Sequence, residues 1–204
     1  DLANLQTFAE DKGDHYLVNG QKTWTSGGQW ADKCFAIVRT DKSDKHKGIS
    51  FMLIDMDKPG VEVRPITMIS GTSPFCETFF TDVKVPKENL IHKEGSGLKV
   101  ALITLNTGRL SLPAACIGGS RRAIEVAKDF SGRRVQWGAP VGKHEAIAHK
   151  IADMAAVTYA MESWCYLSNE MAMRDGYDIR LEAATAKEWG STRSWDMIDD
   201  LMQI

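Results

Sequence analysis

The sequence predicts an α+β protein in which an antiparallel β-barrel or sandwich is followed by an antiparallel α-helical bundle. Short apolar runs separated by turn residues fill the chain up to about Ile91, a density that is typical of antiparallel sheets. From about Gly97 onward apolar residues recur every three or four positions, which is the period of an amphipathic helix. This change of period predicts two domains, residues 1–94 and residues 95–204.

The strands are predicted from the apolar runs, and the turns from the residues between them. Asn19-Gly20 predicts a hairpin turn, because Asn-Gly supplies the positive φ angles that a type I′ turn needs. Pro86 ends the last strand, since proline cannot donate a hydrogen bond to a neighbouring strand. Beyond the hairpin, we expect strands over residues 35–38, 49–54, 61–66 and 78–85, with a turn over residues 58–60.

Three helical segments are expected in the second half. The first begins near Gly97, the second carries an apolar stripe from Ala146 to Cys165, and the third runs from about Ile179 to the end. Pro113 lies inside the first segment. An interior proline costs about 3 kcal/mol, so we expect it to kink the helix or to restart it.

Composition narrows the class of protein. Hydrophobic residues make up 43% and charged residues 25%, and the formal net charge of −2 argues against a nucleic-acid surface. We see no apolar run that predicts a membrane span. The four cysteines are widely spaced and have no metal-ligand spacing, so we expect reduced, mostly buried thiols and no metal site.

Both ends of the sequence look cut. The first residue is Asp rather than Met, and the last residues lie in a helical pattern that has no glycine stop. We therefore expect a piece of a longer protein, whose targeting signal could not be seen here.

Several motifs occur in an informative order. Residues 19–28 read NGQKTWTSGG, which resembles the flavin-side signature NGxKxWI(S/T)xG of the acyl-CoA dehydrogenase family. Residues 80–89 are similar to that family's junction signature FxDVxVPxEN, and residues 95–109, 134–138 and 144–154 follow in the family's order. Any one of these has a plain structural explanation. Together they cover essentially the whole chain as a middle β domain and the start of a C-terminal helical domain.

The resemblance implies an FAD site. Trp24 would pack against the isoalloxazine ring, Ser26 matches the hydroxyl residue that hydrogen-bonds flavin N5, and Thr25 lies beside it. Arg134 matches an arginine that reaches across a dimer interface to the FAD pyrophosphate, for which a guanidinium fork is well suited. The remaining matches face a partner subunit's FAD or lie beside that arginine: Gln136, Trp137 in place of the usual phenylalanine, and Gln203.

The resemblance also implies substrate contacts. Leu98, Leu102 and Leu105 match positions that line the acyl and pantetheine channel, although an amphipathic core face explains them equally well. Arg109 matches the arginine of a family segment that lies near the thioester and CoA end of the pocket. Asn106 replaces the usual Asp there, which weakens the case for CoA contacts.

The family reaction is the α,β-dehydrogenation of an acyl-CoA thioester, with electrons passed to an electron-transferring flavoprotein. A minority branch places the base directly before the arginine that Arg109 matches. Gly108 occupies that position here and cannot take a proton. We therefore expect no catalytic residue in this chain and a base downstream of Ile204.

Three alternatives remain open: an acyl-CoA oxidase on the same fold, a non-catalytic family member that serves as a scaffold, and a β-plus-helix module without flavin. A homodimer or homotetramer is expected, because Arg134 and Gln203 make sense if they complete a neighbour's FAD site. The expected location is the bacterial cytoplasm or, alternatively, the mitochondrial matrix.

Overall fold

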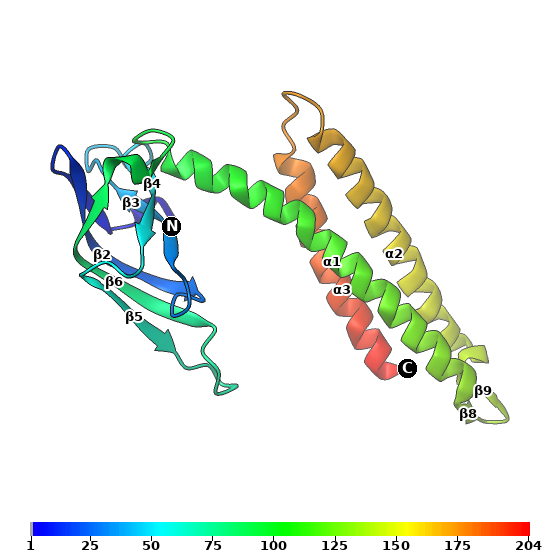
Figure 1. The fold of residues 1–204 in the computed structure, drawn as a ribbon. Coiled ribbons are helices and arrows are strands. Elements are labelled where there is room, and N and C mark those ends of the chain that lie inside the picture. Colours follow the sequence, from blue (N-terminus) through cyan, green and yellow to red (C-terminus); the bar gives the residue numbers. More distant parts are fainter. Residues whose placement is uncertain (1) are drawn as a thin grey trace. The chain divides into compact units, whose positions relative to one another are not determined.

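The computed structural model describes residues 2–204; Asp1, the first residue of the predicted β domain, lies outside the described residues. The chain forms two compact units, one up to Ile103 and the other from Thr104 (Figure 1). This border falls inside a helix, so the boundary between residues 94 and 95 stays a prediction. The α+β fold class is confirmed, with a β sheet in the first unit and helices in the second.

The first unit is built on a seven-stranded sheet with the order β5-β6-β2-β1-β3-β4-β7. All its pairings are antiparallel except β1 with β3, which is parallel and joins Phe8 to Arg39. The strands are β1 Phe8–Asp11, β2 His15–Ser26, β3 Lys33–Arg39, β4 Ile49–Asp55, β5 Val61–Ile66, β6 Phe75–Pro86 and β7 Leu90–Ile91. Short 3-10 helices occur at Leu2–Asn4 and Lys87–Asn89.

Alternate residues of these strands fill one apolar core, because successive side chains of a strand point to opposite faces. Its fully buried members include Tyr16 and Val18 of β2, Val38 of β3, and Met52 and Ile54 of β4. The Tyr16 hydroxyl donates a hydrogen bond to the Glu94 carboxylate, and the Lys87 ammonium lies 3.9 Å from the Tyr16 ring centre.

The predicted hairpin at Asn19-Gly20 is wrong, since β2 runs without a break through both residues. The pairing of β2 with β6 is irregular here, and Gly20 has a φ of 138°. A side chain at Gly20 would lie 2.7 Å from Thr7 Cα, so glycine permits β1 to approach. The Asn19 amide donates to the Asp82 carboxylate at 2.9 Å and accepts from the Asp82 N–H at 2.9 Å. Asn-Gly therefore forms a bulge and a cross-strand link instead of a turn.

The segment between sheet and helix is held closely against β4. The Gly95 N–H donates to the Ser50 hydroxyl at 3.0 Å, and a side chain at Gly97 would lie 2.4 Å from the Ser50 carbonyl carbon. The glycines in this segment therefore allow close backbone approach.

The second unit contains three long helices. Helix α1 spans Gly97–Arg133 across the border, α2 spans Glu145–Ala172 and α3 spans Arg180–Gln203. Between α1 and α2 lie a hairpin of β8 Val135–Gln136 with β9 Ala139–Pro140 and a 3-10 helix at Val141–Lys143. Pro113 does not restart α1, which is one continuous helix. Pro113 is buried, and it packs beside Gly190 of α3, where a Cβ would lie 3.6 Å from the Pro113 Cβ.

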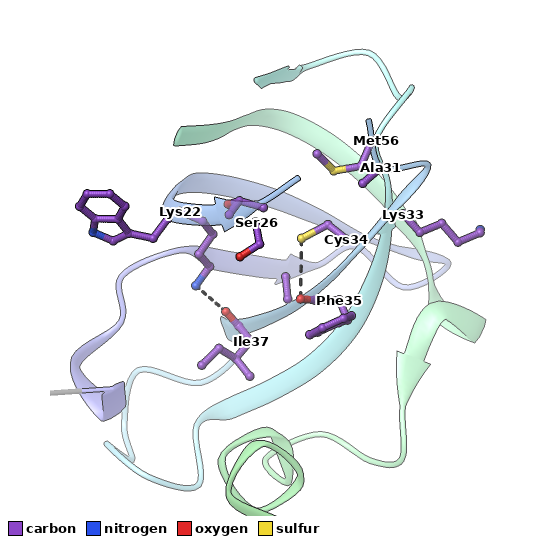
Figure 2. A pocket seen from close by; sticks show the side chains of 11 residues that line it. Lys22, Ser26, Ala31, Lys33, Cys34, Phe35, Ile37 and Met56 are labelled. Carbon is purple, nitrogen blue, oxygen red and sulfur yellow. Dashed lines mark hydrogen bonds between the residues drawn. The ribbon is translucent and has the colours of Figure 1, made fainter. Parts of the chain in front are cut away.

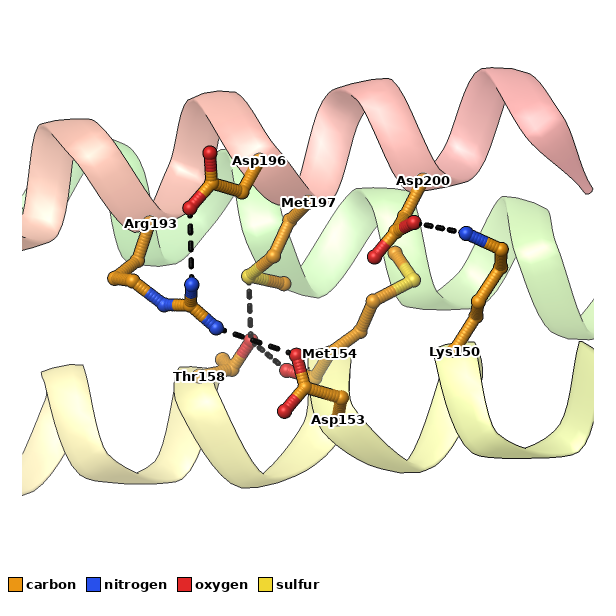
Figure 3. Close-up of polar contacts among 8 residues, drawn as sticks. All are labelled: Lys150, Asp153, Met154, Thr158, Arg193, Asp196, Met197 and Asp200. Atoms are coloured by element: carbon orange, nitrogen blue, oxygen red, sulfur yellow. Dashed lines mark hydrogen bonds and ion pairs between the residues drawn. The ribbon is translucent and has the colours of Figure 1, made fainter.

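The core of the second unit is rich in methionine, with Met154, Met161 and Met197 almost fully buried. Polar pairs at its margin bind α2 to α3 in antiparallel order (Figure 3). Lys150 near the start of α2 pairs with Asp200 near the end of α3, and Arg193 of α3 contacts Asp153 of α2 at 3.3 Å. Such partly exposed pairs contribute at most about 1 kcal/mol each, so they orient the helices more than they stabilise them.

Helix α1 differs from one sequence-based expectation. By length and composition it is apolar enough to cross a membrane, whereas no such segment was expected. Little of its most apolar stretch is buried within the described residues. A helix of this kind also occurs in soluble proteins where other segments cover it, so the composition alone does not assign it to a bilayer.

Candidate functional site

A slot opens in the sheet where its central strand stops. β1 pairs with β2 only over Tyr16–Asn19 and meets β3 only at Arg39, so the second half of β2 and the first part of β3 have no strand between them. A pocket of about 360 Å³ lies in this slot (Figure 2). Its lining comes from β2, β3, the loop between them and the residue after β4, and it includes Lys22, Trp24, Thr25, Ser26, Ala31, Cys34, Phe35, Ala36, Ile37 and Met56.

A bulge in β2 positions Trp24 at this pocket. The strand takes three steps from Lys22 to Thr25 while β6 takes two, and Trp24 has a φ of 66°. This left-handed conformation is costly for a bulky residue, so the neighbouring pairs with β6 must hold it. The indole is 60% exposed and meets the Phe75 ring edge-on, with centroids 5.9 Å apart. Trp24 is therefore an exposed aromatic wall rather than a core residue.

Ser26 and Thr25 differ in what their hydroxyls contact. The Thr25 hydroxyl accepts a hydrogen bond from the Thr78 hydroxyl at 3.1 Å, which ties it to β6. Ser26 is exposed, and within residues 2–204 no protein group hydrogen-bonds its hydroxyl. The Ser26 hydroxyl is thus the one that can serve a ligand in the pocket.

Sequence reasoning missed the other wall of the pocket. Cys34 and Ile37 come from β3, and Phe35 stacks on Phe51 with ring centroids 5.8 Å apart. Lys22 was quoted within the flavin motif but given no role; its ammonium donates to the Ile37 carbonyl at 2.6 Å. Burial lowers the pKa of Lys22 and raises the pKa of the Cys34 thiol. No local pattern reveals these contacts, because they join two strands that the sheet places apart.

Gln136 and Trp137, two of the residues predicted to lie at a partner's FAD site, are on the β8–β9 hairpin, a feature that the sequence reasoning did not identify. Its two-residue loop is Trp137-Gly138, with φ angles of 51° and 81°. Positive φ at both central residues is what a type I′ turn requires. Trp137 is 87% exposed at the loop. Its ring meets the His144 ring edge-on, with centroids 5.6 Å apart.

His144 attaches the hairpin to the start of α2. Its Nε2 lies 3.1 Å from the Gln136 carbonyl oxygen, and the Val141 N–H donates to the Arg134 carbonyl at 2.7 Å. The Arg134 side chain is exposed. Gln203 ends α3 at the same end of the helical unit as this hairpin (Figure 1), as the Lys150–Asp200 pair also requires. Arg134, Gln136, Trp137 and Gln203 are therefore gathered at one end.

The candidate substrate residues lie along α1. Leu102 and Leu105 are each 49% exposed, and neither they nor Leu98 belong to either apolar core. Among the described residues they therefore lie outside both apolar cores, and their role in substrate binding stays a prediction. Arg109 donates to the Asn106 side-chain oxygen at 3.3 Å, one helical turn away. Asn106 thus orients Arg109, which a carboxylate at this position could do as well.

The cysteines are all free thiols. Cys76 and Cys165 are buried, while Cys34 and Cys116 are partly exposed. The expectation of mostly buried thiols therefore holds for half of them. In the part of the chain that the structure describes, no group of three or more His, Cys, Asp or Glu side chains could hold a metal ion.

Comparisons with known proteins agree with the motifs. Residues 1–83 match the family model for the acyl-CoA dehydrogenase middle domain, and residues 95–204 match the model for the C-terminal domain. A probable acyl-CoA dehydrogenase of Mycobacterium tuberculosis is 44% identical over 197 residues, which is 95% of this chain and 30% of that protein. Helix α1 therefore belongs to the matched C-terminal domain.

Solved structures share the fold. The butyryl-CoA dehydrogenase of Megasphaera elsdenii is 32% identical with a TM-score of 0.90, over 100% of this chain and 54% of its own. A chain from a structure described as the electron transferring flavoprotein of Acidaminococcus fermentans is 33% identical with a TM-score of 0.88, over 98% and 53%. This chain thus spans 30% of the first of these relatives and about half of the other two. With both domain models matched in order over nearly its whole length, the chain belongs to the acyl-CoA dehydrogenase family.

Proposed function

We propose that the protein containing this chain is an FAD-dependent enzyme that introduces an α,β double bond into an acyl-CoA thioester. The observation that carries the proposal is the pairing of an exposed, strained Trp24 with the unpaired Ser26 hydroxyl at the mouth of one pocket. Family membership supplies the reaction class. The activity is a proposal because much of each relative lies outside this chain.

The pocket residues fit a flavin ring. Trp24 offers a flat apolar surface that is held in place by the bulge, and strained backbone of this kind is characteristic of ligand sites. The open Ser26 hydroxyl would donate a hydrogen bond to flavin N5, with Thr25 supporting the same stretch of strand. When bound, FAD supplies the hydride acceptor.

The hairpin at the end of the helical unit suits a diphosphate. Arg134 would bind the FAD pyrophosphate of a partner subunit through its guanidinium fork, with Gln136, Trp137 and Gln203 completing that site. All four residues lie at one end of the unit, and the side chains of Arg134 and Trp137 are exposed. A homodimer, or a tetramer built from two such dimers, is therefore part of the proposal.

The substrate would run along the exposed face of α1. Leu98, Leu102 and Leu105 offer apolar contacts for an acyl or pantetheine chain, and Arg109, oriented by Asn106, would face the CoA end. The proton at the α carbon needs a base. We assign that base to a part of the protein outside this chain, because Gly108 stands directly before Arg109 and carries no acid–base group.

The electron acceptor is proposed to be an electron-transferring flavoprotein. The support is the family's reaction and the structural match to a chain in a structure described by that name. An acyl-CoA oxidase would pass electrons to oxygen instead, so dye reduction measured against oxygen consumption separates the two.

The first experiment is the visible spectrum of the purified full-length protein, before and after anaerobic addition of mixed acyl-CoA thioesters. We expect a flavin band that bleaches on addition. A band that persists would argue against acyl-CoA dehydrogenation and favour a non-catalytic scaffold. A protein that binds no flavin would contradict the assignments of Trp24, Ser26 and Arg134.

A further inference from the structure

Lys22 occupies an unusual place in the pocket. It extends from β2 across the slot, and its ammonium donates to the Ile37 carbonyl of β3 at 2.6 Å (Figure 2). β1 begins at Phe8, which pairs with Asn19, so β1 does not reach the part of β2 that carries Lys22. The backbone hydrogen bonds that would normally join neighbouring strands are therefore missing between these two walls, and a lysine side chain bridges them instead.

The Lys22 ammonium has more hydrogen-bond donors than the Ile37 carbonyl uses. It carries three donors, and the Ile37 carbonyl accepts one of them. Within residues 2–204 no ion pair joins Lys22 to a carboxylate, and Cys34 is the titratable group whose charge affects the Lys22 pKa. Burial of an uncompensated cation is costly. A bound group with negative character that faces the Lys22 ammonium would therefore stabilise the site.

A second lysine of the same pocket provides a contrast. The Lys33 side chain points away from Ile37 (Figure 2), and its ammonium forms an ion pair with the Asp55 carboxylate. Its charge is therefore neutralised and largely in solvent. Of these two lysines, Lys22 is the one whose positive charge remains directed at the pocket.

We propose that Lys22 is a positioning residue of the flavin pocket: it sets the spacing of the β2 and β3 walls and directs an uncompensated positive charge at the bound ring. This inference rests on the proposed function and deepens it. A cation beside the ring favours the negative charge that the ring gains on reduction, so Lys22 raises the reduction potential of the flavin. Lys22 thereby acts on the flavin through its charge, whereas Trp24 packs against the ring and Ser26 donates a hydrogen bond to it.

The test uses the full-length protein and three substitutions. Lys22→Met removes both the charge and the bond to Ile37, Lys22→Gln removes the charge but keeps a donor, and Lys22→Arg keeps both. The flavin reduction potential is measured by anaerobic dye equilibration, and FAD affinity by titration of the apoprotein. Lys33→Met is the matched control, since it removes a neutralised lysine from the same pocket.

We expect the reduction potential to fall in Lys22→Met and Lys22→Gln and to stay near the parent value in Lys22→Arg and Lys33→Met. FAD affinity should fall about tenfold in Lys22→Met and less in Lys22→Gln. If Lys22→Met fails to fold, the Gln and Arg variants still decide the question, because each keeps a donor for the Ile37 carbonyl.

Two results would overturn the proposal while leaving the proposed function intact. One is a parent-like potential and affinity in Lys22→Gln and Lys22→Met. The other is a lower affinity with an unchanged potential, which would reduce Lys22 to a strut between strands. A parent protein that binds no flavin would overturn the proposed function, and this inference with it.

Discussion

Two exposed tryptophans, one in each unit, are held by the same backbone device in different surroundings. Trp24 has a φ of 66° in a bulge of a 12-residue strand, and Trp137 has a φ of 51° in the loop of a hairpin whose strands have two residues each. Each meets one ring edge-on, Phe75 for Trp24 and His144 for Trp137. The same strain is therefore supported by a whole sheet in one case and by a few local contacts in the other.

This difference indicates which substitutions will disturb each tryptophan. The Trp24 bulge depends on its pairing with β6, which is far away in sequence, so changes in strand packing will disturb it. The Trp137 loop depends on neighbours within about ten residues, so only local changes will reach it. Four predictions follow from this contrast, taken from the largest expected effect to the smallest.

The largest effect is expected from alanine at two glycines with positive φ. Gly20→Ala should lower the free energy of unfolding by about 3 kcal/mol or more, because its Cβ would lie 2.7 Å from Thr7 Cα. Gly138→Ala has open space and should cost about 1 kcal/mol, the strain of φ alone. Denaturant unfolding measures both. Equal losses would mean that the sheet does not constrain the Trp24 strand more tightly than the hairpin constrains its loop.

The second prediction compares the two indoles in cofactor binding. Trp24→Ala should weaken FAD binding about tenfold, since aromatic stacking contributes about 0.5–1.5 kcal/mol beyond the apolar area it buries. Trp137→Ala should have a smaller effect that disappears in any monomeric form of the protein, because it acts on a partner's site. FAD titration of the full-length apoprotein measures both.

Trp195 provides a control for that experiment. It is 78% exposed on α3 and belongs to no proposed site, so Trp195→Ala should leave FAD affinity unchanged. A Trp24→Ala variant that binds FAD as tightly as the Trp195→Ala control would remove Trp24 from the flavin site.

The third prediction tests the local support of the hairpin. His144→Ala removes the contact with the Gln136 carbonyl and the ring contact with Trp137, worth about 1 kcal/mol together. Backbone amides over residues 135–140 should therefore exchange hydrogen about fivefold faster, as measured by mass spectrometry. His149→Ala is the control, because His149 faces Glu145 on the exposed surface of α2. Faster exchange in the sheet unit as well would contradict a purely local effect.

The smallest effect concerns pH at the Trp24 pocket. Burial raises the pKa of the Cys34 thiol, and the nearby Lys22 opposes this less strongly. Because only the thiolate reacts, alkylation of Cys34 by iodoacetamide should still increase at pH values where an ordinary thiol, with a pKa of about 8.5, has levelled off. A Cys34→Ser variant identifies the signal. If the alkylation rate of Cys34 levels off at the same pH as that of a free thiol, the raised pKa is contradicted.

The same shift has a consequence for stability. The folded state holds the Cys34 proton more tightly than the unfolded state, so the stability it contributes is complete below the unfolded pKa. That contribution is lost as the pH rises through the folded pKa. Unfolding measurements above about pH 9 should therefore reveal a decrease that Cys34→Ser lacks.

Much of the fold was accessible from the sequence because its evidence is local. The change from strand-like runs to a helical period located the sheet and the three helices, and Val61–Ile66 was predicted to the residue. The motif around Trp24 and Ser26 pointed to residues that the structure places along one pocket.

The tertiary structure decided the features that depend on partners distant in the chain. Asn19-Gly20 carries a turn signal, but Thr7 and Asp82 hold it inside a continuous strand. Pro113 leaves α1 unbroken and is buried beside Gly190 of α3. The pocket exists because β1 is shorter than its two neighbours, which leaves Lys22 facing Ile37. Periodicity and local motifs determined the elements, whereas strand pairing determined the site, because hydrogen-bond partners across a sheet leave no mark in the local sequence.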